Sequence, residues 1–188
     1  MHEVMHGVVA RAFGDDTAEQ AGRLTLNPIP HIDPFGTVIL PALLLFLRLP
    51  VFGYARPVPV DFRRLKPARL GMILVAAAGP LTNFTLAILS AAGIHMVYSA
   101  AASGLALSAA RILYASVLIN IMLGVFNLFP ILPLDGGRVL AGILPLRLAR
   151  GYARLERYGI LILFLLLYTD WVDAVIDPII NAIARTLL

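Results

Sequence analysis

The chain has 188 residues, of which 60% are hydrophobic and 14% are charged, and its mean hydropathy of +0.86 favours an integral membrane protein over a soluble domain. The absence of cysteine excludes a disulfide framework and a thiolate metal site, so any metal must be bound by His, Asp or Glu. The formal net charge of +4 resides in basic residues that lie beside apolar stretches, which indicates membrane sidedness and argues against nucleic-acid binding.

The first third of the chain is expected to hold one short helix and then an interfacial region. Residues 1–13 predict a helix of about 20 Å, which is too short to span a bilayer. Residues 14–68 predict an interfacial or re-entrant region in which 23–26 and 56–62 have the pattern of short strands. The apolar stretch 37–52 contains two prolines and an arginine, so a marginal span and a re-entrant element both remain open.

Two long apolar stretches follow. Residues 69–98 and 109–129 predict core helices that form an antiparallel pair, each long enough for a hydrocarbon core of about 30 Å. Residues 130–138 break the second helix and predict a ligand loop, and 158–188 predict one further span with a trailing amphipathic helix. The whole chain is therefore predicted to be a single membrane-embedded domain, a multi-pass α-helical integral membrane protein with a small strand-containing interfacial segment between the first two core helices.

Basic residues gather on one side of the predicted helix pair. The turn between the two core helices is uncharged, so the basic loops at the other ends are expected on the cytoplasmic side of the cell membrane. An independent crossing by 37–52 would separate the first helix from these loops, and we predict that this stretch does not cross alone. The basic residues are Arg48, Arg56, Arg63, Arg64, Lys66 and Arg69 before the pair, and Arg138, Arg147, Arg150, Arg154 and Arg157 after it.

His2-Glu3-Val4-Met5-His6 has the pattern H-E-x-x-H. Residues i and i+4 share one face of a helix, so both imidazoles can reach one metal ion with Glu3 beside it. Histidine pairs of this kind suit zinc. Two other interpretations are a chance match, which this composition would produce in roughly one sequence per thousand, and a polar helix start at the membrane interface. The otherwise apolar helix favours the metal site.

A catalytic zinc ion normally has three protein ligands, so the two histidines need a partner. Asp135 is the best candidate because it ends an apolar stretch in which an unpaired carboxylate would be costly. The alternative for Asp135 is an ordinary turn residue before two glycines. The acidic residues that follow the histidines more closely, Asp15, Asp16 and Glu19, lie in a polar stretch and are expected on the solvated surface.

Three segments together resemble the landmarks of the site-2 protease family of intramembrane zinc metalloproteases, in its compact prokaryotic form. They are His2-Glu3-x-x-His6, then Ala-Gly-Pro-Leu-Thr-Asn at 78–83, then Asn-Leu-Phe-Pro-x-x-Pro-Leu-Asp-Gly-Gly-Arg at 127–138, in the order of the family. The middle landmark ends in Asn83, for which we expect a structural or site-supporting role. Its Gly79-Pro80 pair is interpreted as a kink or as close helix packing.

The resemblance implies a role for each site residue. His2, His6 and Asp135 would bind one zinc ion per chain, and Glu3 would be the general acid and base. Asn127 would be a polar group near the metal that supports the substrate or the oxyanion. The alternative for Asn127 is a hydrogen bond to a neighbouring helix, as intramembrane amides commonly form.

The predicted function is that of an intramembrane zinc metalloendopeptidase, which cuts within or near a transmembrane segment of a membrane-protein substrate in regulated intramembrane proteolysis. Such a substrate must be locally extended, and the regions near Leu24 and Val58 could pair with it as strand edges. The expected partners are this substrate and membrane lipid, without nucleic acid, and the active site is expected toward the cytoplasmic side. The alternative is a truncated or non-catalytic protease-like membrane protein that binds metal or partners.

Overall fold

The computed structural model describes residues 1–188 except for 50, 52, 101–103 and 170. The described residues form helices joined by irregular segments, and none of them is in a β-strand. In chain order the helices are α1 (His2–Ala12), α2 (Thr17–Gln20), the 3-10 helix η1 (Ile29–His31), the π-helix η2 (Pro34–Ile39), α3 (Leu40–Phe46), α4 (Ala68–Ala100), α5 (Gly104–Asn127), α6 (Asp135–Ile143), α7 (Leu146–Ala153), α8 (Glu156–Tyr168) and α9 (Trp171–Leu187).

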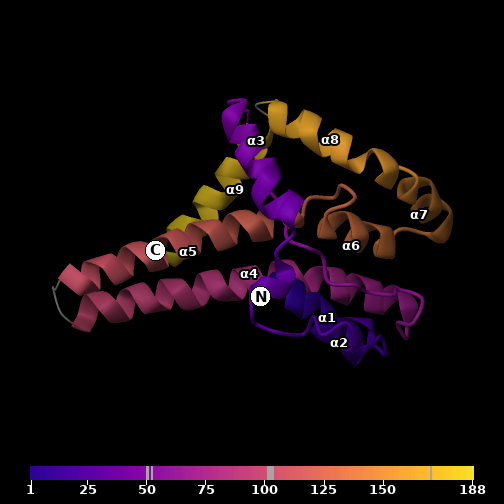
Figure 1. Ribbon diagram of the computed structural model, residues 1–188, viewed down its shortest axis with the longest axis horizontal. Coiled ribbons are helices and arrows are strands. Elements are labelled where there is room, and N and C mark those ends of the chain that lie inside the picture. Colours follow the sequence, from indigo (N-terminus) through magenta and orange to yellow (C-terminus); the bar gives the residue numbers. More distant parts are fainter. Residues whose placement is uncertain (50, 52, 101–103, 170) are drawn as a thin grey trace.

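The antiparallel pair of α4 and α5 is the longest feature of the molecule, and α1 and α6 lie beside the first half of α4 (Figure 1). Both long helices arise from the uninterrupted apolar runs in the sequence. The segments Ala68–Val97 and Gly104–Asn127 are long and apolar enough to cross a membrane. These bounds confirm the two predicted core helices, although α5 begins five residues before the predicted start at 109 and ends two before 129.

The core of the α4–α5 pair is made of small and branched side chains. Ala87 and Ala91 of α4 pack against Val117 and Ile121 of α5, and all four are almost completely buried. Small residues allow two apolar helices to approach closely, which is how helices associate where no water drives them together. Helix α9 covers part of this core through Ile176.

The last apolar stretch differs from its prediction. Instead of one span with a trailing helix, 158–188 belongs to α8, which has 13 residues, and α9, which has 17. Helix α8 ends because Thr169 adopts an extended conformation. At 1.5 Å per residue α8 is about 20 Å long, which is less than a hydrocarbon core. Among the described residues, two helices and not three therefore have spanning length.

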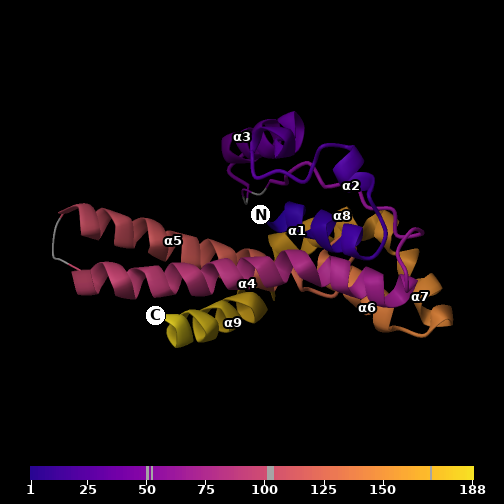
Figure 2. The same cartoon turned by 90° about the horizontal axis from the view of Figure 1, so that it is seen from below.

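Residues 34–46 form a short apolar helical unit in which η2 continues into α3. The Asp33 carboxylate accepts a hydrogen bond from the Gly36 N–H and starts η2. The unit projects from the α4–α5 pair (Figure 2) and exposes large apolar side chains, among them Phe35, Ile39 and Phe46. It has 13 residues, or about 20 Å, so it is too short for the independent span considered for 37–52.

The two predicted strands are wrong. Neither 23–26 nor 56–62 is assigned to a strand in the described chain. Pro57 and Pro59 have no N–H to donate to a ladder, and the N–H of Val58 between them donates to the Glu3 carboxylate, 3.0 Å away. The 57–59 segment therefore offers no backbone donor to a substrate strand, which removes the edge-pairing role expected near Val58.

Asp15 corrects a further expectation, because its side chain is completely buried and not at the solvated surface. Its carboxylate accepts hydrogen bonds from the hydroxyl and N–H of Thr17 and from the N–H of Asp61, and Arg64 lies 3.7 Å away. Burial by itself raises the pKa of Asp15, but these hydrogen bonds and Arg64 outweigh it and hold the pKa below its ordinary value. Asp15 thus ties the end of α1 to the segment before α4.

Candidate metal centre

Helix α1 presents His2 and His6 on the face that packs against α4. The two residues are four apart, so their side chains lie one turn apart on the same side of the helix. Their ring centroids are 4.7 Å apart and the rings are nearly perpendicular, at 83°. The two Nε2 atoms are 3.1 Å apart, so both rings direct the same nitrogen toward one point.

Asp135 completes the group from the opposite side. It is the first residue of α6, where the exposed N–H groups of a helix start favour a negative charge. Its Oδ2 lies 3.1 Å from Nε2 of His2 and 3.4 Å from Nε2 of His6. This oxygen is buried and has no hydrogen-bond partner in the described structure. One ligand atom from each of the three residues lies within 4.8 Å of the others, the only such group of three found among the described residues.

The second nitrogen of each imidazole is held by α4. Nδ1 of His2 lies 2.8 Å from the side-chain oxygen of Asn83, and Nδ1 of His6 lies 2.7 Å from the carbonyl oxygen of Val75. A carbonyl oxygen can only accept, so each Nδ1 carries the proton and each Nε2 has a free lone pair. Metal-binding histidines are oriented in this way by an acceptor on the other nitrogen. Two neutral imidazoles and one carboxylate are a suitable ligand set for zinc.

Gly79 allows α4 to approach the two rings. A Cβ atom at this position would lie 2.5 Å from Nε2 of His6 and 2.6 Å from Nε2 of His2. Such distances are not tolerated, so any larger residue would displace the imidazoles. The glycine in the middle of an apolar helix is therefore explained by close packing against the candidate ligands, which is one of the two interpretations of the Gly79-Pro80 pair.

A chain of hydrogen bonds continues from Asn83 into the α4–α5 interface. Nδ2 of Asn83 donates to the side-chain oxygen of Asn120 at 3.3 Å, and Asn120 donates in turn to the carbonyl oxygen of Ser116 at 2.9 Å. The hydroxyls of Ser116 and Ser90 are 2.8 Å apart. Asn120 was not among the residues predicted from the sequence, although an amide in an apolar span is itself a signal for an interhelical partner.

Glycines also permit the turn that carries Asp135. A Cβ at Gly136 would overlap the backbone carbonyl of Leu128, and one at Gly137 would lie 2.5 Å from the backbone nitrogen of Leu132. On the other side of this loop, Gly159 lets the backbone of α8 contact the carbonyl of Leu132. The chain is thus folded back on itself between α5 and α6, and this brings Asp135 to α1.

The two predicted catalytic residues have different surroundings. Glu3 lies beside His2 on α1, and its Oε2 accepts the hydrogen bond from Val58 described above. Asn127 is the last residue of α5, and its Nδ2 donates to the Leu123 carbonyl of its own helix at 3.0 Å. Within the described residues, Asn127 makes no hydrogen bond to another helix, which was its alternative role, and none to the three ligand residues. Its catalytic role stays a prediction.

The group lies at the level of the middle of α4. Gly79 and Asn83, which contact the two imidazoles, are 11 and 15 residues after Ala68, the first residue of this helix. At 1.5 Å per residue these positions are roughly 16 to 22 Å along the helix. The candidate metal centre is therefore beside the central part of an apolar helix and not at its end.

Comparison with known proteins decides the family. The chain is 38% identical to the "Putative zinc metalloprotease YwhC" of Bacillus subtilis over an alignment of 188 residues. This alignment covers 97% of this chain and 81% of that protein. Residues 90–169 match the family model described as peptidase family M50. The chain belongs to peptidase family M50. This confirms the resemblance to site-2 proteases. The M50 family is membrane-embedded and depends on zinc, in agreement with the predicted membrane protein and the predicted zinc cofactor.

Two further relatives also have names of zinc metalloproteases. The "Putative zinc metalloprotease Rip2" of Mycolicibacterium smegmatis is 31% identical over 169 residues, which is 90% of this chain and 62% of that protein. The "Zinc metalloprotease MJ0392" of Methanocaldococcus jannaschii is 36% identical over 74 residues, or 39% of this chain and 20% of that protein. No solved structure is significantly similar to the chain.

Proposed function

We propose that this M50 protein is an active intramembrane peptidase whose zinc ion is bound by His2, His6 and Asp135. The observation that carries the proposal is the convergence of both Nε2 atoms on the unpartnered Oδ2 of Asp135, with both Nδ1 atoms held by α4. Without a bound cation, a buried carboxylate oxygen with no hydrogen-bond donor is costly. A zinc ion accounts for all three side chains at once.

When held by His2, His6 and Asp135, a zinc ion would supply a Lewis acid for the scissile carbonyl and would lower the pKa of a bound water. Glu3 takes a proton from the attacking water as the new C–O bond forms at the carbonyl carbon. It returns this proton to the amide nitrogen as the C–N bond breaks, so the carboxylate is restored. The hydrogen bond from the Val58 N–H holds one oxygen of Glu3 in place and leaves the other for this transfer.

The role of Asn127 in this reaction is to donate to the developing oxyanion or to the substrate backbone. Its Nδ2 bonds to a carbonyl of its own helix end, so this donor would be redirected when a substrate binds. Loss of one oxyanion donor costs about 2.7 to 4 kcal/mol in other enzymes. An Asn127→Ala variant should therefore bind zinc normally and cleave at least about a hundredfold more slowly.

The proposed substrate is the transmembrane segment of another membrane protein, cut in regulated intramembrane proteolysis. Support comes from the depth of the site along α4 and from the apolar surface of α4 and α5. We further propose a multi-pass arrangement in the cell membrane with the site toward the cytoplasm, because the basic residues precede α4 and follow α5. A reporter at Asp16 found outside the cell would contradict this orientation.

A Glu3→Gln variant tests the proposal. It should retain about one zinc ion per chain, because Glu3 is not a ligand, and lose cleavage of a model transmembrane peptide by roughly 10²- to 10⁴-fold, the usual contribution of a general acid or base. His6→Ala is the matched variant and should lose the zinc as well. If the wild-type protein binds zinc and cleaves no transmembrane peptide, it is instead a protease-like protein that binds metal or partners without cutting.

A further inference from the structure

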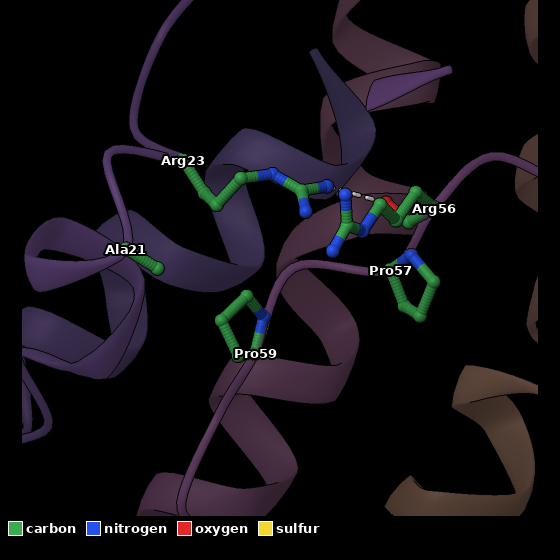
Figure 3. Close-up of a pocket in the computed structure, with 5 residues that line it drawn as sticks. All are labelled: Ala21, Arg23, Arg56, Pro57 and Pro59. Atoms are coloured by element: carbon green, nitrogen blue, oxygen red, sulfur yellow. Dashed lines mark hydrogen bonds between the residues drawn. The ribbon is translucent and has the colours of Figure 1, made fainter. Parts of the chain in front are cut away.

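A small polar pocket lies between the segment after α2 and the 56–59 segment. It has a volume of about 270 Å³ and is lined by Ala21, Arg23, Arg56, Pro57 and Pro59 (Figure 3). Pockets for drug-sized ligands measure about 300 to 1,000 Å³. This pocket therefore suits a single small group, and its only charged lining residues are two arginines.

The two guanidinium groups point toward each other (Figure 3). Arg23 is 93% buried, since its exposed fraction is 7%, and it donates one hydrogen bond to the backbone carbonyl of Arg56 at 2.7 Å. Its Nε is buried without a hydrogen-bond partner. In the described structure neither arginine forms an ion pair with a carboxylate. A buried cation beside a second cation is unfavourable until an anion joins them.

The pocket shares no lining residue with the candidate metal centre. The Val58 side chain is buried against α1, where its Cγ1 would meet a Cβ added to Gly7 at 3.0 Å. Pro57 and Pro59 on either side of Val58 line the pocket instead. A ligand in the pocket is thus separated from Glu3 by the 57–59 chain, so it would not take part in the hydrolysis itself.

The surroundings of the pocket indicate where its anion comes from. Between the two lining segments the chain makes its excursion through η2 and α3, which exposes Phe46 by 83% and also leaves Phe35 and Ile39 exposed. Apolar surface of this kind is covered by lipid in a membrane protein. Arg56 lies at the base of this excursion, where its N–H donates to the carbonyl of His31 at 2.9 Å. The pocket therefore adjoins apolar surface that lipid would cover, within reach of an anionic headgroup.

We propose that Arg23 and Arg56 form a binding site for the phosphate of an anionic phospholipid headgroup. The planar guanidinium forks match phosphate oxygens in paired hydrogen bonds, and the unpartnered Nε of Arg23 supplies one of the donors. Bound lipid then fixes the 56–59 segment, including the Val58 N–H that holds Glu3. This inference concerns a lipid site and does not depend on the chain being an active peptidase.

Retention of phosphatidylglycerol by the purified full-length chain, counted by native mass spectrometry, tests the site. The wild type should keep one phosphatidylglycerol molecule in preference to phosphatidylcholine. Arg56→Gln and Arg23→Gln should each weaken binding about tenfold or more, the effect of losing a charge-assisted hydrogen bond. Arg63→Gln is the matched control, because Arg63 is an exposed arginine of the same connecting segment and is outside the pocket.

The variants separate the possible outcomes. Arg56 is exposed, so Arg56→Gln is expected to fold even if Arg23→Gln does not. Equal loss of lipid in Arg63→Gln, or no loss in Arg56→Gln, would overturn the site. Inorganic phosphate is the second ligand tested. If the variants lose phosphate binding while they retain phosphatidylglycerol, the pocket binds free phosphate and the lipid assignment is wrong.

Discussion

Nδ1 of His2 lies 2.8 Å from the side-chain oxygen of Asn83, a residue 81 positions further along the chain. This hydrogen bond joins the short helix α1 to the middle of the apolar helix α4. It fixes the imidazole so that Nε2 faces His6 and Asp135. Asn83 is only 2% exposed, so water does not compete for its oxygen. The site thus depends on a polar residue within an apolar helix as well as on its three ligands.

Replacing Asn83 with alanine should weaken zinc binding. The loss of an acceptor behind a metal-binding histidine typically reduces metal affinity about 10- to 100-fold. Competition with a chromogenic chelator measures this change directly, without a cleavage assay. Thr85→Ala is the control on the same helix, because the Thr85 hydroxyl is exposed and bonds only to the Leu81 carbonyl. Equal affinities for the Asn83 and Thr85 variants would contradict the proposed role.

Asn120 should act on the metal centre through Asn83. Its side-chain oxygen accepts from Nδ2 of Asn83 at 3.3 Å and so keeps the oxygen of Asn83 directed at His2. Asn120→Ala should lower zinc affinity by less than Asn83→Ala does, and the double variant should be no weaker than Asn83→Ala alone. Additive losses in this double-mutant cycle would show that the two amides act independently.

Gly79→Ala should disrupt the metal centre by steric overlap. The new methyl group would lie 2.5 Å from Nε2 of His6, so either the rings or α1 must move. We expect loss of stoichiometric zinc while the protein still inserts into membranes, since alanine favours the helix. Zinc content per purified chain is the measurement. Gly151→Ala is the control, because a Cβ there meets no heavy atom within 4 Å, and a Gly79 variant with full zinc would refute the packing argument.

The candidate site could be predicted from the sequence to the extent that local patterns determine it. The spacing of His2 and His6 follows from helical periodicity, and the long apolar runs predict α4 and α5. The acceptors for the histidines could not be found in this way. Val75 contributes a backbone carbonyl, which any residue type supplies, and the bond from Asn83 to Asn120 joins two helices whose register the sequence does not state.

The errors have physical causes as well. The alternating pattern at 56–62 resembles a strand, but a strand requires backbone partners, and here the free N–H of Val58 is used by a side chain. Asp15 lies in a polar stretch, yet it is buried because Asp61 and Arg64 come to it from a distant segment of the chain. The lack of an ion pair at Arg23 was not predicted for the same reason, because the local sequence does not show which acidic residues approach it in the fold.

The stability of the fold should depend on pH through Asp15. Its pKa is lowered in the folded protein, mainly because hydrogen bonds from Thr17 and Asp61 overcome the effect of burial. A carboxyl group with a lowered folded-state pKa stabilises the fold fully above its unfolded value of about 3.9 and loses this contribution as the pH falls toward the folded-state value. Thermal inactivation in detergent should therefore accelerate below about pH 4 in the wild type.

An Asp15→Asn variant should remove this pH dependence. The neutral amide still fits but cannot accept from all three donors, so we expect a loss of about 1 to 3 kcal/mol in the free energy of unfolding at neutral pH. Between pH 5 and pH 3 the variant should change less than the wild type. Glu19→Gln is the control, because Glu19 is exposed and pairs only with Arg11 at the surface, where an ion pair contributes little. If Asp15→Asn keeps the same acid sensitivity as the wild type, another carboxylate is responsible for it.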